Sequence, residues 1–599
     1  MPNPPAFGPY LRIRGCGSPH FSPDGSRIAF ITNTTGTPEL WSAPASGGWP
    51  QQLSFGAERI WGSTYSPGPD VAVIARDRGG NERNQLIAIP GGGGQERALT
   101  NLPDVIHHIG AWSPDGRRLA FSANREHPID FTVYIQDLDG TGEATAVWRA
   151  SGQHRVADWS ADGRRLLIAH SNSPSDQDLH VLDLTNGQSH QANPHTPDAT
   201  FQAAAFLDAL GEEIICLSDE GREFAGVLRL AADGGRTWVL TPEHDIEALA
   251  LSPTRTHICY AVNDDGTSRL RVRDLRTGED RALAGMPEGV LTAEPAWSPN
   301  GSRIAVSLSQ ATRPEAVWVA DLTNGSTYEV APPTFAGIDP ATFVAPEHVS
   351  FPSFDGRRIP ALYYRPRGVS GPIPVIVSVH GGPEGQERGG FNAVYQYFLS
   401  RGYGILAPNV RGSTGYGRTY EHLDDRFQRM DSVNDMAHGV AWLKAAGGAD
   451  PRRIAVYGAS YGGFMVMAGI THHPDLWAAA IDIVGIVNLE TLLENTHPAR
   501  RYLREAEYGF LATDREFFRQ IAPINHADKI RAPLMVIHGK NDPRVPHEEA
   551  EQIVGFLRAK NRPVEFLSFD NEGHGVARLE NRLVAYPAIA DFLDRHMGT

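Results

Sequence analysis

One pentapeptide has the residues and the spacing of a catalytic nucleophile. Ser460 lies in the stretch Gly458-Ala459-Ser460-Tyr461-Gly462, which follows an apolar strand pattern and precedes an apolar helix pattern. A G-x-S-x-G sequence in this context is typical of a sharp strand-to-helix turn that exposes a serine hydroxyl above a sheet. Because a hydroxyl is a poor nucleophile until a base takes its proton, the motif also requires a histidine and an acid.

The histidine and the acid are predicted in two loops that each follow a late strand pattern. Asp542 follows the apolar run 533–539, and His574 follows the run 564–569. The carboxyl ends of parallel strands meet at one edge of a sheet, so the three side chains can converge there. We therefore predict that His574 is the general base and that Asp542 holds its tautomer.

Other acids and histidines near these loops are less well placed. Asp570 could be the acid instead, but it lies only four residues before His574 on the same loop and is poorly positioned to brace that ring. His526, His538 and His547 do not follow the final strand. We interpret His538 as a residue that packs the loop.

A developing oxyanion needs fixed hydrogen-bond donors. The backbone N–H of Tyr461, directly after the nucleophile, is one candidate. The second is expected in the loop His380-Gly381-Gly382-Pro383, where glycine allows close approach and proline has no N–H to offer. We choose the amide of Gly382, although the glycines could equally form only a turn, an alternative that applies also to Gly381.

The elements that must position these residues alternate between apolar strands and helical patterns. Short, continuously apolar runs are typical of parallel strands that are buried on both faces. The runs are residues 373–379, 403–410, 453–460, 478–485, 533–539 and 564–569, with helix patterns at 435–446, 463–471 and 547–560. This alternation predicts a doubly wound, mostly parallel α/β domain over residues 336–599.

The first part of the chain is a repeat. A signature of the type aromatic-Ser-Pro-Asp-Gly recurs at Ser22, Ser113 and Ser298, with weaker copies at Ser66, Ser160, Leu207 and Ser252. The copies are 44 to 47 residues apart, and each unit adds a second hairpin closed by a glycine turn. Two hairpins per unit of this length predict a four-stranded propeller blade. Residues 1–335 are therefore predicted as a seven-bladed β-propeller, with the Ser-Pro-Asp-Gly segments as turns rather than metal or phosphate sites.

The composition narrows the class of protein. The 599 residues include 54 basic and 70 acidic side chains, a net charge of −16, which disfavours nucleic acid and anionic lipid as partners. No signal peptide or membrane segment is readable, so we expect a cytoplasmic protein without membrane contact. Three widely spaced cysteines give no disulfide framework, and no histidine or cysteine cluster has ligand spacing, so neither a metal nor an organic cofactor is expected.

With these motifs in order, the chain resembles the prolyl oligopeptidase family of serine peptidases over essentially its whole length. The resemblance rests on the propeller repeats followed by HGGP, NVRGSTGYG at 409–417, GASYGG, HGKNDPRVP and NEGHG. It implies hydrolysis of short peptides through an acyl-enzyme, in a cavity between propeller and hydrolase that screens out folded proteins. The elbow and the HGGP loop look most like the acylaminoacyl peptidase and dipeptidyl aminopeptidase branches. Oligomers are common in the family, so a homo-oligomer is a further expectation.

The resemblance also directs attention to groups that read the end of a peptide. Dipeptidyl peptidases grip a free amino terminus with a Glu-Glu pair on the propeller, and Glu212-Glu213 is such a pair, but it lies in a tight turn and we interpret it as solvated. That branch also uses a tyrosine hydroxyl for the oxyanion, near the position of Glu384 in this chain.

Three arginines between the nucleophile and the acid could clamp a peptide carboxylate. They are Arg500, Arg501 and Arg504, of which the first and third would share a helix face. The alternative, which we prefer, is that they pair with Glu494, Glu505 or Glu507.

The hypothesis that follows is an acylaminoacyl or aminoacyl exopeptidase, or an oligopeptidase, acting on short peptides. One alternative is an esterase or amidase that acts on a small acyl or aminoacyl metabolite, since the same catalytic group cleaves esters. Another is a propeller binding module with an inactive hydrolase, which the complete set of motifs argues against.

Overall fold

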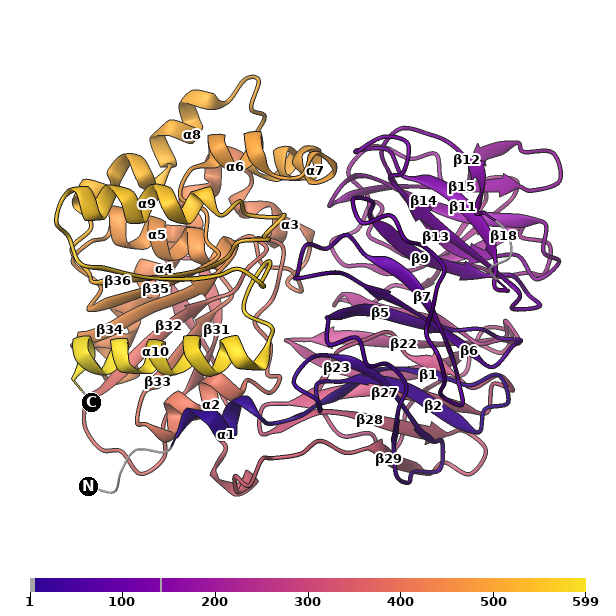
Figure 1. Cartoon of the computed structure of the whole chain (residues 1–599), viewed down its shortest axis with the longest axis horizontal. Helices are drawn as coiled ribbons and strands as arrows, with labels where there is room; N and C mark the ends of the chain where they lie inside the picture. The colour runs from indigo at the N-terminus through magenta and orange to yellow at the C-terminus, as the bar shows by residue number, and fades with distance from the viewer. Residues whose placement is uncertain (1–5, 140–142, 599) are drawn as a thin grey trace.

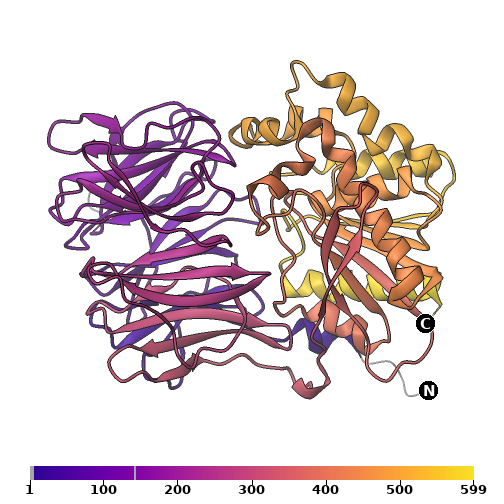
Figure 2. The ribbon, with the colours of Figure 1, turned by 180° about the vertical axis from the view of Figure 1, so that it is seen from behind.

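The computed structural model describes residues 6–139 and 143–598. A ring of seven antiparallel β-sheets faces one end of an α/β domain, as the two opposite views in Figures 1 and 2 show. The architecture is therefore a seven-bladed β-propeller joined to an α/β-hydrolase, as the sequence predicts. The catalytic candidates lie on loops of the α/β domain that point toward the propeller.

Six blades have four strands each, and the seventh has five. The blades are β1–β4 (Cys16–Phe21, Arg27–Thr32, Glu39–Pro44, Gln51–Gln52), β5–β8 (Ile60–Tyr65, Val71–Arg76, Gln85–Pro90, Arg97–Ala98), β9–β12 (His107–Trp112, Arg118–Ala123, Thr132–Asp137, Thr145–Trp148), β13–β16 (Gln153–Trp159, Arg165–Ser173, Asp176–Asp183, Ser189–Gln191), β17–β20 (Phe201–Phe206, Glu213–Ser218, Gly226–Ala231, Arg236–Leu240), β21–β24 (Ile246–Leu251, His257–Asp264, Thr267–Asp274, Asp280–Ala282) and β25–β29 (Val290–Leu291, Ala296–Trp297, Arg303–Gln310, Arg313–Asp321, Thr327–Ala331). The inner strand of the last blade is split into β25 and β26 around Pro295, which cannot donate to a strand ladder.

The Ser-Pro-Asp-Gly segments are turns, as predicted. In the first blade, the Ser22 hydroxyl donates to Asp24 at 2.6 Å and accepts the backbone N–H of Arg27 at 3.0 Å. The same pair of contacts recurs at Ser113, Ser160 and Ser298. These side chains satisfy the backbone of the hairpin locally, so the motif stabilises the turn.

The ring closes where the first blade packs against the seventh. Each of these two blades is built only from its own consecutive strands. Strand β1 packs against β26, β27 and β28 of the seventh blade. Two backbone hydrogen bonds of 3.1 Å join Arg14 to Thr334, where the chain enters and leaves the propeller.

The N-terminal helix α1 (Phe7–Leu11) lies on the α/β domain although the sequence analysis assigned residues 1–335 to the propeller. Phe7 stacks on Tyr397 with 3.6 Å between ring centroids, and α1 contacts α2 (Ala393–Ser400) and α10 (Leu579–Met597), as Figure 1 shows. The chain therefore crosses between the two domains twice, once after α1 and once before β30.

The α/β domain is built on one eight-stranded sheet with the order β30-β31-β33-β32-β34-β35-β36-β37. Its strands are β30 (Glu347–Pro352), β31 (Arg358–Tyr364), β32 (Ile373–Val379), β33 (Gly404–Pro408), β34 (Ala449–Ala459), β35 (Ala479–Ile483), β36 (Leu534–Gly539) and β37 (Val564–Phe569). All six predicted strands are present. The antiparallel edge pair β30–β31 was not predicted, because its alternating pattern resembles the strands of the propeller.

Helices cover both faces of this sheet. On one face lie α4 (Arg429–Trp442), α5 (Tyr461–His472) and α9 (Glu548–Ala559), and on the other lie α1, α2 and α10. The remaining elements are α3 (Arg418–Glu421), α6 (Leu489–Asn495), α7 (Pro498–Tyr508), α8 (Arg515–Ile521), the 3-10 turns Pro340–Thr342, His422–Asp424, Arg426–Gln428 and Pro523–Lys529, and a π-turn at Leu443–Gly447. Helix α4 starts earlier than predicted because its first turns bury the polar residues Arg429 and Ser432.

Within the part of the chain that the structure describes, no helix combines the length and apolar composition needed to cross a membrane. The three cysteines are unpaired and buried in the propeller.

Candidate active site

Ser460 lies at the sharp turn between β34 and α5. Its backbone has φ 60° and ψ −121°, a conformation that a residue with a side chain rarely adopts. The turn is possible because its neighbours are glycines: a Cβ on Gly458 would lie 2.2 Å from the carbonyl oxygen of Gly462, and a Cβ on Gly462 would lie 2.2 Å from that of Val379. The strained turn, predicted from the motif, places Ser460 at the carboxyl end of the central strand.

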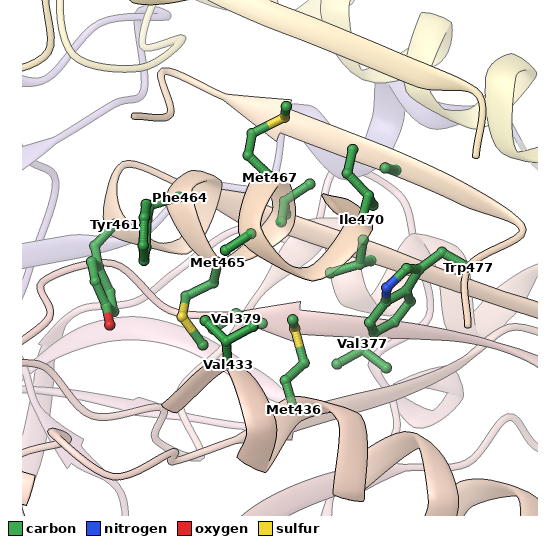
Figure 3. Packing of buried hydrophobic residues seen from close by; sticks show 14 of the residues in the cluster. Val377, Val379, Val433, Met436, Tyr461, Phe464, Met465, Met467, Ile470 and Trp477 are labelled. Carbon is green, nitrogen blue, oxygen red and sulfur yellow. The ribbon is translucent and has the colours of Figure 1, made fainter. Parts of the chain in front are cut away.

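Helix α5 holds the turn rigidly because it is buried on every side. Figure 3 shows Met465 and Phe464 of α5 among Val379 of β32 and Val433 and Met436 of α4. Every residue of α5 from Tyr461 to Thr471 is buried. A helix packed on all sides cannot shift without opening the core, so the position of Ser460 is fixed by the sheet and α4.

Asp542 and His574 are in direct contact. His574 Nδ1 donates to Asp542 Oδ2 at 2.7 Å, across the loops that follow β36 and β37. The other carboxylate oxygen, Oδ1, accepts the backbone N–H groups of Arg544 at 2.8 Å and Val545 at 3.0 Å. Each oxygen of the carboxylate thus has its own partners, and the imidazole is oriented as a general base requires. Among the described residues the Ser460 hydroxyl has no hydrogen bond, and such contacts are often loose before substrate binds.

The surroundings of Asp542 keep it ionised. Burial raises the pKa of this carboxyl, but the positive charge of His574 and the hydrogen bonds from His538 and His574 outweigh burial and hold the pKa below its ordinary value. His538 is fully buried, its Nε2 donates to the carbonyl of Val545 at 3.0 Å, and the same atom lies 3.5 Å from Asp542 Oδ2. His538 therefore packs the acid loop, as predicted, and also supports its carboxylate.

The alternative acid and histidines lie elsewhere. The exposed Asp570 pairs with Lys540 at 2.7 Å. His526 contacts the carbonyl of Gln520, and His547 contacts the hydroxyl of Ser568. No hydrogen bond or ion pair to His574 is found for any of these three among the residues with described positions.

The His380-Gly381-Gly382-Pro383 loop lies against the nucleophile turn. A Cβ on Gly381 would lie 3.4 Å from the Cβ of Ser460 and 4.0 Å from the amide nitrogen of Tyr461, whereas Gly382 has its nearest neighbours in its own loop. His380 fixes this loop through a 2.9 Å contact of its Nε2 with the hydroxyl of Ser413. Gly381 is thus packed directly against the turn, and the choice of Gly382 as the second oxyanion donor stays a prediction.

Below Ser460, the Tyr461 side chain ends in a buried polar cluster. Its hydroxyl donates to Asp424 at 2.9 Å and accepts from Arg429 at 3.1 Å. Arg429 also pairs with Asp424 and Glu507, so one guanidinium lies between two carboxylates. The tyrosine side chain is therefore occupied, and only its backbone N–H is free to act on a substrate.

We expect the Tyr461→Phe variant to separate these two roles. It keeps the backbone N–H, so kcat should stay within about threefold of the parent value, while loss of the buried hydroxyl lowers the free energy of unfolding by roughly 1–3 kcal/mol. Steady-state kinetics and denaturant unfolding measure the two effects. A fall in kcat of about a hundredfold or more with unchanged stability would assign the reaction to the hydroxyl instead.

Asp482 at the end of β35 is buried under the same turn. One of its oxygens has no hydrogen-bond partner among the described residues, and a Cβ on Gly463 would lie 2.4 Å from that oxygen. Burial raises the pKa of Asp482 to about 7. The folded protein therefore holds a proton on this carboxyl at a pH where the unfolded chain has lost it.

This arrangement predicts a pH-dependent stability. The contribution of Asp482 is fully present below the unfolded pKa near 4, and it is lost as the pH rises toward 7, by an amount on the order of 4 kcal/mol. Thermal unfolding at a fixed scan rate should show a smaller drop in midpoint between about pH 5.5 and pH 8 for Asp482→Asn than for the parent chain. Equal drops in the two proteins would show that Asp482 is already ionised.

The three arginines of the predicted clamp have separate partners. Arg501 pairs with Glu505 at 3.3 Å, as the preferred alternative stated. Arg500 instead pairs with Glu82 of the propeller, and Arg504 lies 3.3 Å from Glu384. Arg504 also approaches the carbonyl of Gly382 at 3.5 Å, so α7 connects the propeller to the HGGP loop.

The Glu212-Glu213 pair lies where the turn meets β18: Glu212 is exposed, as predicted, whereas Glu213 begins the strand and is half-buried. Glu213 contacts Arg229 at 2.5 Å, and Glu212 contacts Arg165 at 4.0 Å.

Sequence reasoning missed a propeller loop that contacts the loops of both Asp542 and His574. Residues 77–84, between β6 and β7, have the sequence DRGGNERN. The carbonyl of Gly79 accepts from Asn541 at 2.9 Å, and a Cβ on Gly80 would lie 2.4 Å from the backbone nitrogen of Gly573. Glu82 pairs with both Arg500 and Arg544. The signal was a charged, glycine-containing loop of eight residues where the fourth, sixth and seventh blades have a two-residue turn.

A cavity of about 340 Å³ lies between the propeller and the α/β domain. Its wall includes Trp61 of β5, Glu82, Arg500 of α7 and Arg544, which lies two residues after Asp542. Trp61 also lines a small recess of about 30 Å³ beside His574. The loop that carries Asp542 thus borders the cavity through Arg544, and the loop that carries His574 borders the small recess.

Two groups of side chains in the described part of the chain have metal-ligating atoms close together: His170, Asp178 and His180, and Asp424, Asp425 and Glu507. In the first group, both carboxylate oxygens of Asp178 accept side-chain amides, and in the second, Arg429 already pairs with two of the three carboxylates. Neither group includes Ser460, Asp542 or His574.

Comparison with known proteins agrees with this geometry. The family model described as "Prolyl oligopeptidase family" matches residues 390–599, and the model "Acetyl xylan esterase (AXE1)" matches residues 315–441. Dipeptidyl aminopeptidase BIII of Pseudoxanthomonas mexicana is 27% identical over 96% of this chain and 86% of its own length. An acylamino-acid-releasing enzyme of Arabidopsis thaliana is 32% identical over 37% of this chain and 30% of its own.

Solved structures share the whole architecture. A puromycin-hydrolyzing peptidase of Mycobacterium tuberculosis superposes with a TM-score of 0.88 at 21% identity, covering 100% of this chain and 97% of that one. A puromycin hydrolase superposes with a TM-score of 0.85 at 22% identity, covering 98% and 95%. At these identities the structures establish the fold. Taken with the full-length relative and the family model, they show that the chain is a serine-type peptidase whose residues 390–599 match the prolyl oligopeptidase family.

Proposed function

We propose that this peptidase cleaves short peptides through an acyl-enzyme, with Ser460 as nucleophile, His574 as general base and Asp542 as the acid that orients it. The observation that supports the proposal best is the 2.7 Å contact between His574 and the buried Asp542 at the covered edge of the sheet. His574 takes the proton of Ser460 as the hydroxyl attacks, and returns it to the leaving amine. Water then attacks the acyl-enzyme, with His574 again taking the proton, and this releases the acyl group.

The oxyanion of each tetrahedral intermediate is assigned to the backbone N–H groups of Tyr461 and Gly382. Tyr461 begins α5, so its N–H belongs to the free first turn of that helix and benefits from the helix dipole. The strained backbone at Ser460 and the packed loop at Gly381 keep the donors in place before substrate arrives. Preorganised donors of this kind supply much of the rate enhancement in acyl transfer.

The propeller limits the size of the substrate. The cavity of about 340 Å³ is at the small end of the range that holds a drug-sized ligand, so it accommodates a few residues of an extended peptide. Loop 77–84 and α7 close it against the catalytic loops. The relatives named as dipeptidyl aminopeptidase and acylamino-acid-releasing enzyme are, by those names, enzymes of the chain end. We therefore infer an exopeptidase, or an oligopeptidase restricted to short chains.

A panel of free and N-acylated peptides tests this function. Purified enzyme and the Ser460→Ala variant are incubated with the panel, and mass spectrometry identifies the products. Removal of one residue or one dipeptide by the parent enzyme alone supports an exopeptidase and names the end that it reads. Equal product formation by both proteins would contradict the assignment of Ser460, and absence of cleavage would leave a binding module.

A second candidate is hydrolysis of a small aminoacyl amide or acyl ester. Two structures with the same fold are a puromycin-hydrolyzing peptidase and a puromycin hydrolase, and an esterase model matches part of the chain. Adding aminoacyl chromogenic amides and short-chain esters to the same panel separates the two candidates. Turnover of these compounds without cleavage of any peptide would replace the peptide substrate by a small molecule.

A further inference from the structure

We propose that Arg155 forms an anion subsite in the interdomain cavity and binds a carboxylate of the substrate. The inference rests on the proposed function and specifies the class of peptide that the site takes. Arg155 lies on β13, the inner strand of the fourth blade, and lines the same cavity as Arg544 of the loop that carries Asp542.

The charges of the cavity wall are unbalanced. Its titratable lining residues other than histidine are the three arginines Arg155, Arg500 and Arg544 and the single carboxylate Glu82. Arg500 and Arg544 both pair with Glu82. For the side chain of Arg155, neither a hydrogen bond nor an ion pair is found in residues 6–139 and 143–598. One guanidinium thus remains without a counter-charge.

The histidines of the wall do not change this balance. Burial lowers the pKa of His108, and the nearby charges of Arg155 and Arg500 lower it further. Burial likewise lowers the pKa of His107, to about 4. Both rings are neutral at about pH 7, and the effect of the two arginines on His108 places their positive charge on the same part of the wall.

Arg155 is accessible to a ligand but only partly to bulk solvent. Its side chain is exposed to the space of the cavity, whereas the surrounding protein lowers its pKa by desolvation. The guanidinium therefore borders the cavity while protein atoms surround it on the other sides. Apolar side chains such as Ile106, Phe131 and Leu503 form the neighbouring wall. An anion there is attracted more strongly than at an open surface, because little water screens the charge.

The chemistry of guanidinium identifies the ligand class. Its planar fork of N–H donors matches a carboxylate and binds it with two parallel hydrogen bonds. Charged groups enclosed by protein are nearly always paired, so an unpaired arginine facing a substrate cavity is suited to an anion that arrives with the substrate. A peptide offers such a group at its carboxyl terminus or on an Asp or Glu side chain.

The test compares peptides that differ only in one carboxylate. One pair is a short neutral peptide with a free carboxyl terminus and its amide. The other pairs are amidated peptides with Glu or Gln at a single position. Values of kcat/KM are measured for the parent enzyme, for Arg155→Gln, and for Arg164→Gln, a control on an exposed outer turn of the same blade.

We expect the parent enzyme and Arg164→Gln to prefer one carboxylate-bearing member by about tenfold or more. Arg155→Gln should reduce that preference to within about threefold and leave the neutral member almost unchanged. The pair whose preference is lost identifies the source of the carboxylate. Because an unpaired guanidinium is removed, the midpoint of thermal unfolding should be unchanged or higher in Arg155→Gln.

Binding measured without turnover keeps this test separate from the proposed function. Calorimetry of the same peptide pairs with Ser460→Ala, and with Ser460→Ala combined with Arg155→Gln, should show the same preference and its loss. The subsite would be overturned if the preference for the carboxylate survived in Arg155→Gln, or if the parent enzyme showed no such preference. Either result would leave the peptidase assignment intact. Failure of the parent enzyme to cleave any peptide would instead contradict the proposed function.

Discussion

Replacement of Ser460 by alanine should lower kcat by about 10⁴-fold or more while the protein stays folded. Removal of a nucleophile from a serine hydrolase costs up to about 10⁶-fold, because only the oxyanion donors and substrate binding remain. The hydroxyl of Ser460 has no hydrogen bond among the described residues, so its removal leaves no buried partner unsatisfied. Progress curves with a chromogenic substrate and thermal unfolding measure the two effects.

The double variant Ser460→Ala/His574→Ala provides the control for this prediction. Residues that act as one unit are not additive, so the double variant should be no slower than the slower single variant. A further loss that multiplies the two single effects would mean that His574 acts independently of Ser460. A Ser460→Ala protein with more than about a tenth of the parent activity would place the nucleophile elsewhere.

The Asp542→Asn variant should lose about 10⁴-fold in kcat with little change of fold. The amide side chain keeps an oxygen that accepts the backbone N–H groups of Arg544 and Val545, so the loop retains its hydrogen bonds. The oxygen that accepts from His574 is replaced by an NH₂ group, which can only donate. His574 must then turn its unprotonated nitrogen toward this NH₂ group rather than toward Ser460, and the imidazole holds the wrong tautomer for a base.

Asp570→Asn is the matched control for the acid. It changes the carboxylate that was weighed as the alternative acid, but that side chain is exposed and pairs with Lys540. We expect kcat within about threefold of the parent value, since exposed ion pairs contribute little. A large loss in Asp570→Asn together with a small loss in Asp542→Asn would reverse the assignment.

The fold and the core of the candidate site could be predicted because their signals are local. The turn at Ser460 depends on glycines within two residues of it, and Asp542 and His574 each follow a continuous apolar strand. The propeller is encoded by a repeat in which Ser22 and its equivalents close their own turns. Local hydrogen bonds and periodic burial leave a direct trace in the sequence.

The surroundings of the site could not be predicted because they are assembled from distant segments. Glu82 and Arg500 are separated by 418 positions, yet they pair across the cavity. Nothing in the sequence around Arg155 marks it, and only the contact of β13 with α7 makes it part of the cavity wall. The partner of Arg504 was likewise missed, because Glu384 comes from a loop on the other side of the nucleophile.

The N-terminal helix illustrates the same limit. Phe7 and Tyr10 precede the first repeat and carry no strand or helix periodicity of their own, so the sequence analysis included them in the propeller. They are buried against α2 and α10 of the α/β domain. The assignment failed because burial of a five-residue helix depends on the partner surface rather than on its own pattern.

The most direct test of the account is to identify the residue that becomes acylated. The enzyme is reacted with a serine-directed fluorophosphonate, with and without a competing short peptide, and the adduct is located by intact mass and peptide mapping. We expect one adduct, on Ser460, that is slowed by the peptide, is absent from Ser460→Ala, and forms at least about 10³-fold more slowly in His574→Ala. An adduct on another serine, or peptide hydrolysis that continues at the parent rate after Ser460 is fully modified, would contradict it.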